Sequence, residues 1–480
     1  MSSAARTEAG PPKIVLPCAP RLSAIVLLAL LGFATRGAAA DAPWKIGLAS
    51  IRITPDQPVL MYGYAGRTEP HKGVASDLFA KALAFEDPSG QRAVLVTTDL
   101  GGLHGDMTSR IAQQLGEKHR LSRASILFNS SHTHAGPLPW VAAEDVNGSA
   151  EPAIAATRAY CGQLEQMLQK VAGDALANLQ PASLAWGLGM APFVMNRRQF
   201  TDKGIILGFN PKGPVDRSVL VLRIDDAAGK LRAVLMGAAC HCTCSGSRNF
   251  EIDGDYAGYA QSVLQAQFPG VQAMFMAGCG GDANPWPRGG IPEAKQHGTT
   301  LATEVARVLA EKLTPVRPPL KTAFQSVPLP LAPPASREKL VAMSKSSGWE
   351  RYVGGRHLAL LDRGLSPPTS FPMPISCWQF GGDFTLVALG GEPVNAYVHF
   401  IENAIGPLRL WVAGYSNDVF GYVPSAQILA EGGYESRGID RGDAVGQFTP
   451  DVEKVIVRAV TAMAKETGRT NGGATTPLAQ

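Results

Sequence analysis

The chain has 480 residues, of which 45% are hydrophobic and 18% charged, and it contains 52 glycines and 36 prolines. This composition is typical of a globular protein with a sizeable core and many loops, so it excludes a disordered chain and disfavours a helical bundle. The formal net charge is only +4, and no basic tract or basic–aromatic stripe is present, which excludes nucleic acid as a partner.

The N-terminal forty residues have the pattern of a leader for export. Basic residues precede a short apolar core at residues 22–34, and residues 38–40 are alanines of the kind that a signal peptidase needs. The apolar core is too short to span a bilayer comfortably, although an uncleaved anchor is the alternative. We therefore expect a secreted or periplasmic protein. Its expected parts are a signal peptide (1–40), a catalytic domain (41–464) and a disordered tail (465–480).

Hydrophobic periodicity predicts strands interleaved with helices along the rest of the chain. The expected strands are 44–54, 78–86, 92–98, 125–131, 183–188, 219–224, 231–239, 273–277, an edge strand within 315–334, 384–389 and 408–413. The expected helices are 106–121, 151–179, 257–267, 298–312, 337–345 and 451–464. Because hairpins alternate with helices, we predict an α/β (mixed α+β) fold with mixed sheets flanked by helices.

Two histidines follow the expected strand at 125–131. His132 and His134 are two residues apart, so in an extended backbone both imidazoles project from the same face. Histidine is the commonest metal ligand and the usual acid or base near neutral pH. A surface loop with two histidines is the alternative, and the pair alone does not decide between them.

The cysteines form a second cluster. After residue 40 six remain, and Cys240, Cys242 and Cys244 alternate with His241. On an extended chain the three thiols would share one face and His241 would lie on the other, so they would not converge on one ion with that histidine. Small buried cysteines are therefore favoured over a metal–thiolate site.

Further candidate residues lie at strand ends and in glycine-rich turns. His241 follows one expected strand and Glu392 follows another, within Gly390–Pro393. Taken singly, His241 is more typical of a core histidine, and Glu392 of a turn carboxylate that caps the helix after Pro393. Asp99, at the end of the strand at 92–98, is a candidate to orient a ligand histidine through a hydrogen bond.

Together these motifs resemble the neutral (non-lysosomal) ceramidases. The segments that recur there in the same order are Ser-Ser-His-Thr-His-Ala-Gly-Pro at 130–137, Asn196-Arg197, His241, Gly-Asp-Ala-Asn-Pro at 281–285, Gly391-Glu392, and Gly-Tyr-Ser-Asn-Asp at 414–418 through Gly421-Tyr422. The resemblance covers the catalytic domain of that family, from about residue 44 to about residue 464, and implies its fold.

The resemblance also implies the site residues. Family members hold one zinc ion with two histidines, a glutamate and a tyrosine, which correspond to His132, His241, Glu392 and Tyr422. His134 would then act on the substrate or its proton. Arg197 matches an active-site arginine, and Tyr434 matches a second active-site tyrosine.

The implied reaction is hydrolysis of an N-acyl amide by water activated at zinc: ceramide to a sphingoid base and a fatty acid, or a related N-acyl substrate. Zinc accepts nitrogen and oxygen ligands, leaves a position for water in catalytic sites, and lowers the pKa of that water towards about 7. The partners this implies are a lipid or N-acyl small molecule and a peripheral membrane contact. The sequence sets no oligomeric state.

The chain departs from the family at three points. Asn284 stands where the family has a serine, Val423-Pro424-Ser425 replaces the tyrosine-rich segment after Tyr422, and the family's C-terminal immunoglobulin-like domain is expected to be absent. We therefore expect a distant member whose substrate is smaller or less lipidic than ceramide. A zinc-dependent esterase, lactonase or amidase for a non-sphingolipid substrate is the first alternative, and a non-catalytic binding protein is the second.

Overall fold

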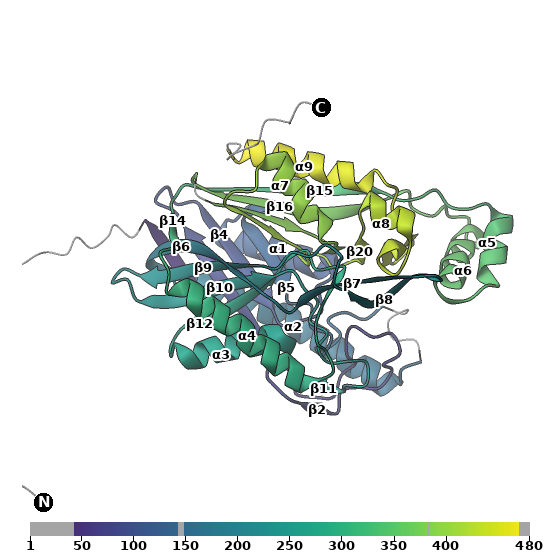
Figure 1. The fold of residues 1–480 in the computed structure, drawn as a ribbon, viewed down its shortest axis with the longest axis horizontal. Coiled ribbons are helices and arrows are strands. Elements are labelled where there is room, and N and C mark those ends of the chain that lie inside the picture. The colour runs from purple at the N-terminus through teal and green to yellow at the C-terminus, as the bar shows by residue number, and fades with distance from the viewer. Residues whose placement is uncertain (1–42, 143–147, 383, 470–480) are drawn as a thin grey trace, which may run out of the picture. The chain divides into compact units, whose positions relative to one another are not determined.

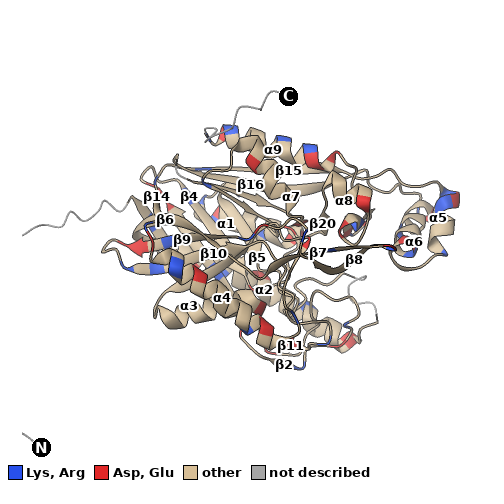
Figure 2. Ribbon diagram, in the orientation of Figure 1, with Lys and Arg blue, Asp and Glu red and all other residues tan. Residues whose placement is uncertain are grey.

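The computed structural model describes residues 43–142, 148–382 and 384–469 (Figure 1). The expected signal peptide and residues 470–480 of the expected tail lie outside these ranges. Within them, no helix is both long enough and apolar enough to cross a membrane. Figure 2 shows acidic and basic residues interspersed on some of the outer helices, with no basic stripe on the described ribbon.

The largest sheet is nine-stranded and mixed. Its strand order is β12-β10-β9-β6-β1-β3-β4-β5, and β14 pairs with β6. The strands are β1 (Trp44–Arg52), β3 (Phe79–Glu86), β4 (Arg92–Thr98), β5 (Ile126–Ser130), β6 (Gln180–Met190), β9 (Ser218–Asp226), β10 (Leu231–Ala238), β12 (Gln272–Ala277) and β14 (Thr314–Val316). Two pairs, β4 with β5 and β10 with β12, are parallel, and the other pairs are antiparallel.

A second sheet has four strands in the order β15-β16-β17-β19. They are β15 (Leu320–Pro330), β16 (Ser370–Phe380), β17 (Phe384–Leu389) and β19 (Leu410–Ala413), and β17 pairs with β19 in parallel. Trp44 and Phe85 of the large sheet pack against Phe380 of the small one at ring-centroid distances of 5.8 and 5.5 Å. One apolar core therefore lies between the two sheets.

Helices cover the outer faces of both sheets (Figure 1). On the large sheet α3 and α4 share a core with β9, β10 and β12, and α1 and α2 share another with β3, β4 and β5. On the small sheet α7 and α9 cover β15–β17. These helices are α1 (Gly105–His119), α2 (Glu151–Ala177), α3 (Asp255–Gln267), α4 (Ile291–Leu309), α7 (Ala396–Ile405) and α9 (Val452–Glu466). The layers are thus helix, sheet, sheet, helix, a mixed α/β architecture as predicted.

Short elements surround the strand ends. The β-elements are β2 (Gly73–Val74), β7 (Val194–Thr201), β8 (Gly204–Asn210), β11 (Glu251–Ile252), β13 (Ala283–Pro285), β18 (Glu392–Pro393), β20 (Tyr422–Val423), β21 (Ile439–Arg441) and β22 (Ala444–Gly446). The helical ones are α5 (Arg337–Ser344), α6 (Gly348–Asp362), α8 (Ala426–Glu431), and the 3-10 turns at Arg123–Ser125 and Glu435–Arg437.

Most expected elements match the structure within a few residues, and the exceptions have physical reasons. The helix expected at 298–312 begins instead at Ile291, because Pro292 is tolerated in its first turn. Strand β16 and helix α6 were not predicted: β16 carries two prolines, and α6 opens on glycine at residue 348. Helix α9 runs to Glu466, and Arg469 donates hydrogen bonds to the carbonyls of Ile405 and Gly406 at 2.8 and 2.7 Å.

Candidate metal centre

The candidate ligands come from the carboxyl ends of strands that pair in parallel. His132 follows β5, His241 follows β10 and Glu392 follows β17. Loops at the carboxyl ends of parallel strands are the usual place for a site in α/β sheets. The backbone at His132 is left-handed, with φ of 63°, which is rare for a residue with a Cβ and turns its ring out of the line of β5.

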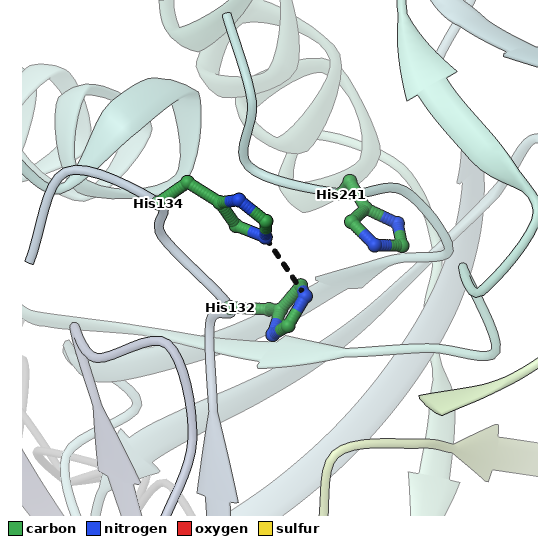
Figure 3. Close-up of side chains that lie close together, drawn as sticks. All are labelled: His132, His134 and His241. Atoms are coloured by element: carbon green, nitrogen blue, oxygen red, sulfur yellow. Dashed lines mark hydrogen bonds between the residues drawn. The ribbon is translucent and has the colours of Figure 1, made fainter. Parts of the chain in front are cut away.

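Three side-chain atoms meet at one point. Oε2 of Glu392 lies 3.1 Å from Nε2 of His132 and 3.1 Å from Nε2 of His241. Nε2 of His134 lies 3.1 Å from Nε2 of His132. One nitrogen atom from each of the three histidines lies within 4.8 Å of the other two (Figure 3). His132 and His241 are 1% and 0% exposed, so their nitrogens are out of reach of bulk water.

The other nitrogen of each buried ring is held by a backbone carbonyl. Nδ1 of His132 lies 2.5 Å from the oxygen of Gly101, and Nδ1 of His241 lies 2.8 Å from the oxygen of Gly280. A carbonyl only accepts, so each Nδ1 carries a hydrogen and the lone pair of an unprotonated Nε2 points inward. Hydrogen bonds of this kind, made by the ring nitrogen that faces away from the metal, orient histidine ligands in metal sites.

The charge states of these side chains suit the cluster to a cation. Burial and the nearby Arg197 lower the pKa of His241 to about 3, so that ring is neutral. Burial opposes ionisation of Glu392, but positive charge at the adjacent histidines and hydrogen bonds from them hold the pKa of its carboxyl well below its ordinary value. The lone pair of a neutral imidazole and a carboxylate repel each other at 3.1 Å, so an ionised Glu392 needs a proton or a metal ion between it and the rings. The donor set therefore fits a bound metal ion, and its nitrogen and oxygen atoms suit zinc.

His134 stands in a different position from the other two histidines. It lies at the wall of two cavities, whereas neither His132 nor His241 lines either one. Its ring packs edge-on against Tyr62 and Tyr64, with centroids 5.8 and 5.1 Å away. A Cβ on Gly63, whose φ is +103°, would lie 2.5 Å from the ring, so only glycine fits there. Burial and the other two histidines lower the pKa of His134 well below its ordinary value.

The expected tyrosines and arginine lie together beside His241. The hydroxyl of Tyr422 is 3.4 Å from Nε2 of His241 and accepts a hydrogen bond from Arg197 at 3.0 Å. The ring of Tyr434 meets that of Tyr422 edge-on, at a centroid distance of 5.3 Å. All seven residues predicted from the sequence as site residues therefore gather around one point.

Buried Glu435 is the main residue at this site that the sequence did not reveal. It is 0% exposed, and it accepts from Arg197 at 2.8 Å and from Arg198 at 2.7 Å. Tyr415 was also not assigned a role, yet its ring packs against that of His132 at 4.4 Å. Adjacency of Glu435 to Tyr434 was the only signal in the sequence, and an acidic residue in a loop is ordinarily solvent-exposed.

Two expectations about neighbouring residues are corrected. Asp99 does not contact a histidine; its side chain accepts from the backbone N–H of Phe79 at 2.9 Å and from Gln261 at 2.8 Å. The carbonyl of Gly101, two residues later, orients His132 instead. Nor does Glu392 cap α7, because its carboxylate faces the histidines. The expectation for Cys240, Cys242 and Cys244 is confirmed: all are free and buried in the core beneath α3 and α4.

The two cavities meet at this centre. The larger has a volume of about 1600 Å³ and is lined by aromatic residues that include Tyr62, Trp140 and Phe371. The smaller has a volume of about 450 Å³ and lies between the β7–β8 hairpin and the loop after β13. Their shared lining is Gly63, Tyr64, His134, Tyr422 and Tyr434.

Comparison with known proteins identifies the family. Residues 44–285 match the family model described as neutral/alkaline non-lysosomal ceramidase, N-terminal. The match covers half of the chain, and the protein belongs to this family. His132, His134, Arg197 and His241 lie within the matched range, whereas the other site residues lie beyond it.

Individual relatives are distant. Neutral ceramidase B of Dictyostelium discoideum is 27% identical over 276 residues, which are 52% of this chain and 36% of that protein. Neutral ceramidase of Drosophila melanogaster is 23% identical over 281 residues, 55% of this chain and 39% of that protein. The chain therefore aligns with less than half the length of these curated relatives.

The fold extends the likeness over most of the chain. A solved structure described as ceramidase complexed with C2 superposes with a TM-score of 0.68 at 18% identity, covering 90% of this chain and 77% of that one. The crystal structure of neutral ceramidase from Pseudomonas aeruginosa superposes with a TM-score of 0.67 at 20% identity, covering 91% and 76%. The predicted neutral-ceramidase-like fold is confirmed.

Proposed function

We propose that the protein is a zinc-dependent hydrolase that cleaves an N-acyl amide, with ceramide or a related N-acyl compound as substrate. The observation that carries the proposal is the convergence of Nε2 of His132, Nε2 of His241 and Oε2 of Glu392, with each histidine fixed through Nδ1 by a carbonyl. Family membership supports amide hydrolysis as the reaction. His132, His241, Glu392 and Tyr422 would hold the metal, which when bound would supply a polarising charge and an activated water.

The residues around these ligands then take distinct parts. His134, at the wall of both cavities, accepts a proton from the attacking water at Nε2 and returns it to the amide nitrogen as that group leaves. Its lowered pKa favours the neutral imidazole that such a base requires. Arg197 holds the hydroxyl of Tyr422 at 3.0 Å, and Tyr434 lies beside it to donate to the carbonyl oxygen as charge develops.

The test separates metal binding from turnover. Purified protein should contain about one zinc per chain, and His132→Ala and His241→Ala should lose it. His134→Ala should keep the metal and lose hydrolysis of a labelled ceramide and a short-chain N-acyl amine. A metal-free protein whose histidine variants hydrolyse these amides like the wild type would overturn the proposal. Matched ester substrates in the same assay test the esterase alternative.

We also propose that the protein is exported and that residues 1–40 are removed as a signal peptide. The basic, apolar and small-residue segments of the leader support this. Expression with the full leader, followed by mass spectrometry of the mature N-terminus in extracellular and periplasmic fractions, tests it. Recovery of the uncleaved chain in the membrane fraction would favour the anchor.

A further inference from the structure

The smaller cavity differs from the larger one in its charge. Its described lining contains Arg197, Arg288 and His134 but neither aspartate nor glutamate, whereas the larger cavity carries side chains of both signs. Arg197 is neutralised by Glu435 at 2.8 Å. Arg288 forms no ion pair within the described part of the chain; its guanidinium donates only to the hydroxyl of Tyr64, at 3.3 Å.

Arg288 is presented by a loop that is anchored on both sides. The N–H of Trp286 donates to the oxygen of Phe193 at 2.8 Å, and the N–H of Gly289 donates to the oxygen of Cys244 at 3.1 Å. Between them, Nε2 of His297 lies 2.6 Å from the oxygen of Pro287. The half-buried guanidinium is therefore held in the cavity wall by a fixed backbone and not by a carboxylate.

A second donor faces the same space. Oδ1 of Asn284 accepts from Thr243 at 3.1 Å and from Arg197 at 3.5 Å, so the oxygen of this amide is already occupied. Its Nδ2 group has no partner among the described residues, and Asn284 lines the cavity. An arginine and an amide N–H₂ that are not paired with a carboxylate of the protein are suited to bind a carboxylate or phosphate of a ligand.

The outer part of the cavity is apolar. Leu207 and Phe209 of β8 and Trp286 line it, and the rings of Phe209 and Trp286 pack at a centroid distance of 4.6 Å. Trp286 and Leu207 are 45% and 49% exposed, so this rim is open to a ligand. An anionic group flanked by an apolar side chain would match both halves of the cavity.

The two cavities adjoin at His134, Tyr422 and Tyr434, so an amide bound across the centre has room for one end in each cavity. The larger, aromatic cavity suits an acyl chain, which leaves the smaller one for the amine side. We propose that the small cavity is an anion-binding subsite for the amine side of the substrate, so that N-acyl amino acids with an apolar side chain are preferred over neutral amides. This inference rests on the proposed amide hydrolysis.

The experiment compares two substrates that differ only in charge. N-hexanoyl-L-phenylalanine carries the carboxylate, and N-hexanoyl-L-phenylalaninol replaces it with a hydroxymethyl group. We expect kcat/KM to favour the acid by about tenfold to a hundredfold, since a charge-assisted hydrogen bond contributes about 1.5–3 kcal/mol. Arg288→Ala should remove most of this preference through KM, and Arg288→Lys should restore part of it. Arg158→Ala, an exposed arginine on α2, is the matched control.

Two further measurements keep the outcomes distinct. Comparing the hydrolysis of ceramide 1-phosphate with that of ceramide tests whether the subsite binds a phosphate. A preference for the phosphate, without a preference for the acid over the alcohol, would mean that the subsite binds an anion but that this anion is a phosphate and not a carboxylate. If no amide is hydrolysed, calorimetry of both phenylalanine compounds with His134→Ala still tests the subsite, because tighter binding of the acid needs no turnover. Equal kcat/KM and equal affinity for acid and alcohol, unchanged in Arg288→Ala, would overturn the inference and leave the proposed hydrolysis standing.

Discussion

The side chain of Asn129 binds the backbone of Ala277 as a neighbouring strand would. Its Oδ1 accepts from the N–H of Ala277 at 2.9 Å, while its Nδ2 donates to the oxygen of Gly414 at 2.8 Å. Asn129 lies on β5, Ala277 on β12 and Gly414 just after β19. One buried amide thus joins the two end strands of the large sheet to the small sheet.

We expect Asn129→Leu to weaken both the fold and the site. The apolar isostere leaves the N–H of Ala277 buried and unpaired, which costs about 1–3 kcal/mol of unfolding free energy. Because the chain that follows β5 carries His132, the affinity for the metal should fall together with stability. Urea denaturation and metal titration measure the two effects, with the exposed Asn178→Leu as control. Wild-type stability in Asn129→Leu would show that the amide bridge contributes nothing.

Glu435 provides the second prediction. It is the buried partner of both Arg197 and Arg198, so Glu435→Ala leaves Arg197 without an ionic partner and Arg198 with Glu431 alone, at a cost of about 3–5 kcal/mol. Glu435→Gln should be milder for stability but still lower kcat, because Arg197 loses the charge that orients it. Thermal unfolding and steady-state kinetics measure these effects.

Glu431→Ala is the matched control for Glu435. Glu431 pairs with Arg198 alone, at 2.9 Å, and its side chain is 23% exposed. A partly exposed pair of this kind contributes about 1 kcal/mol or less. If Glu431→Ala and Glu435→Ala were equally destabilised, the buried pair with Arg197 would not be the cause.

The sequence predicted the strand ends well because the strands around the site are apolar runs bounded by glycine and proline. Strands 92–98 and 384–389 were predicted at their observed bounds, and His132, His241 and Glu392 follow such runs. Each residue was ambiguous by itself, and only the resemblance joined them into one site. Their convergence depends on strand order, which periodicity does not encode.

What the sequence could not reveal is the support around those ligands. The carbonyls of Gly101 and Gly280 carry no side-chain signal, yet they set the tautomers of the two buried histidines. Asp99 was the more obvious partner by residue type, and the structure turns it toward Gln261. The β7–β8 hairpin was missed because its alternation is broken by Arg197 and Arg198, which face Glu435.

Lys81 gives a pH-dependent prediction. It is 4% exposed and donates to Gln261 at 2.9 Å, to Gln265 at 2.9 Å and to the oxygen of Ala273 at 2.7 Å. Burial lowers its pKa to about 8, although the carboxylate of Asp99 opposes the shift. Between pH 8 and the ordinary lysine value, the unfolded chain therefore binds more protons than the folded one.

Because the unfolded chain binds more protons in this pH range, the contribution of Lys81 to the unfolding free energy rises with pH between about pH 8 and the ordinary lysine pKa. Between about pH 8 and pH 10.5 the unfolding free energy of the wild type should gain about 3 kcal/mol relative to Lys81→Met. Urea denaturation at pH 7.5, 9 and 10.5 measures the difference, and the exposed Lys45→Met should run parallel to the wild type. Parallel profiles for Lys81→Met would mean that Lys81 titrates normally in the fold.

Gly63 gives the last prediction, which concerns the position of His134. Alanine there would adopt a φ of +103° and bring its Cβ within 2.5 Å of Cγ and Nδ1 of the His134 ring, so the ring must move. A displacement of about 1 Å at a catalytic group can cost about a hundredfold in rate. We expect Gly63→Ala to lose turnover on that scale while retaining metal, because His132 and His241 are held elsewhere. Gly66→Ala, in the same loop with no heavy atom within 4 Å of its Cβ, should behave like the wild type. Metal analysis and kinetics on the two variants decide the matter: turnover at the wild-type level in Gly63→Ala would show that His134 need not occupy this position for the reaction.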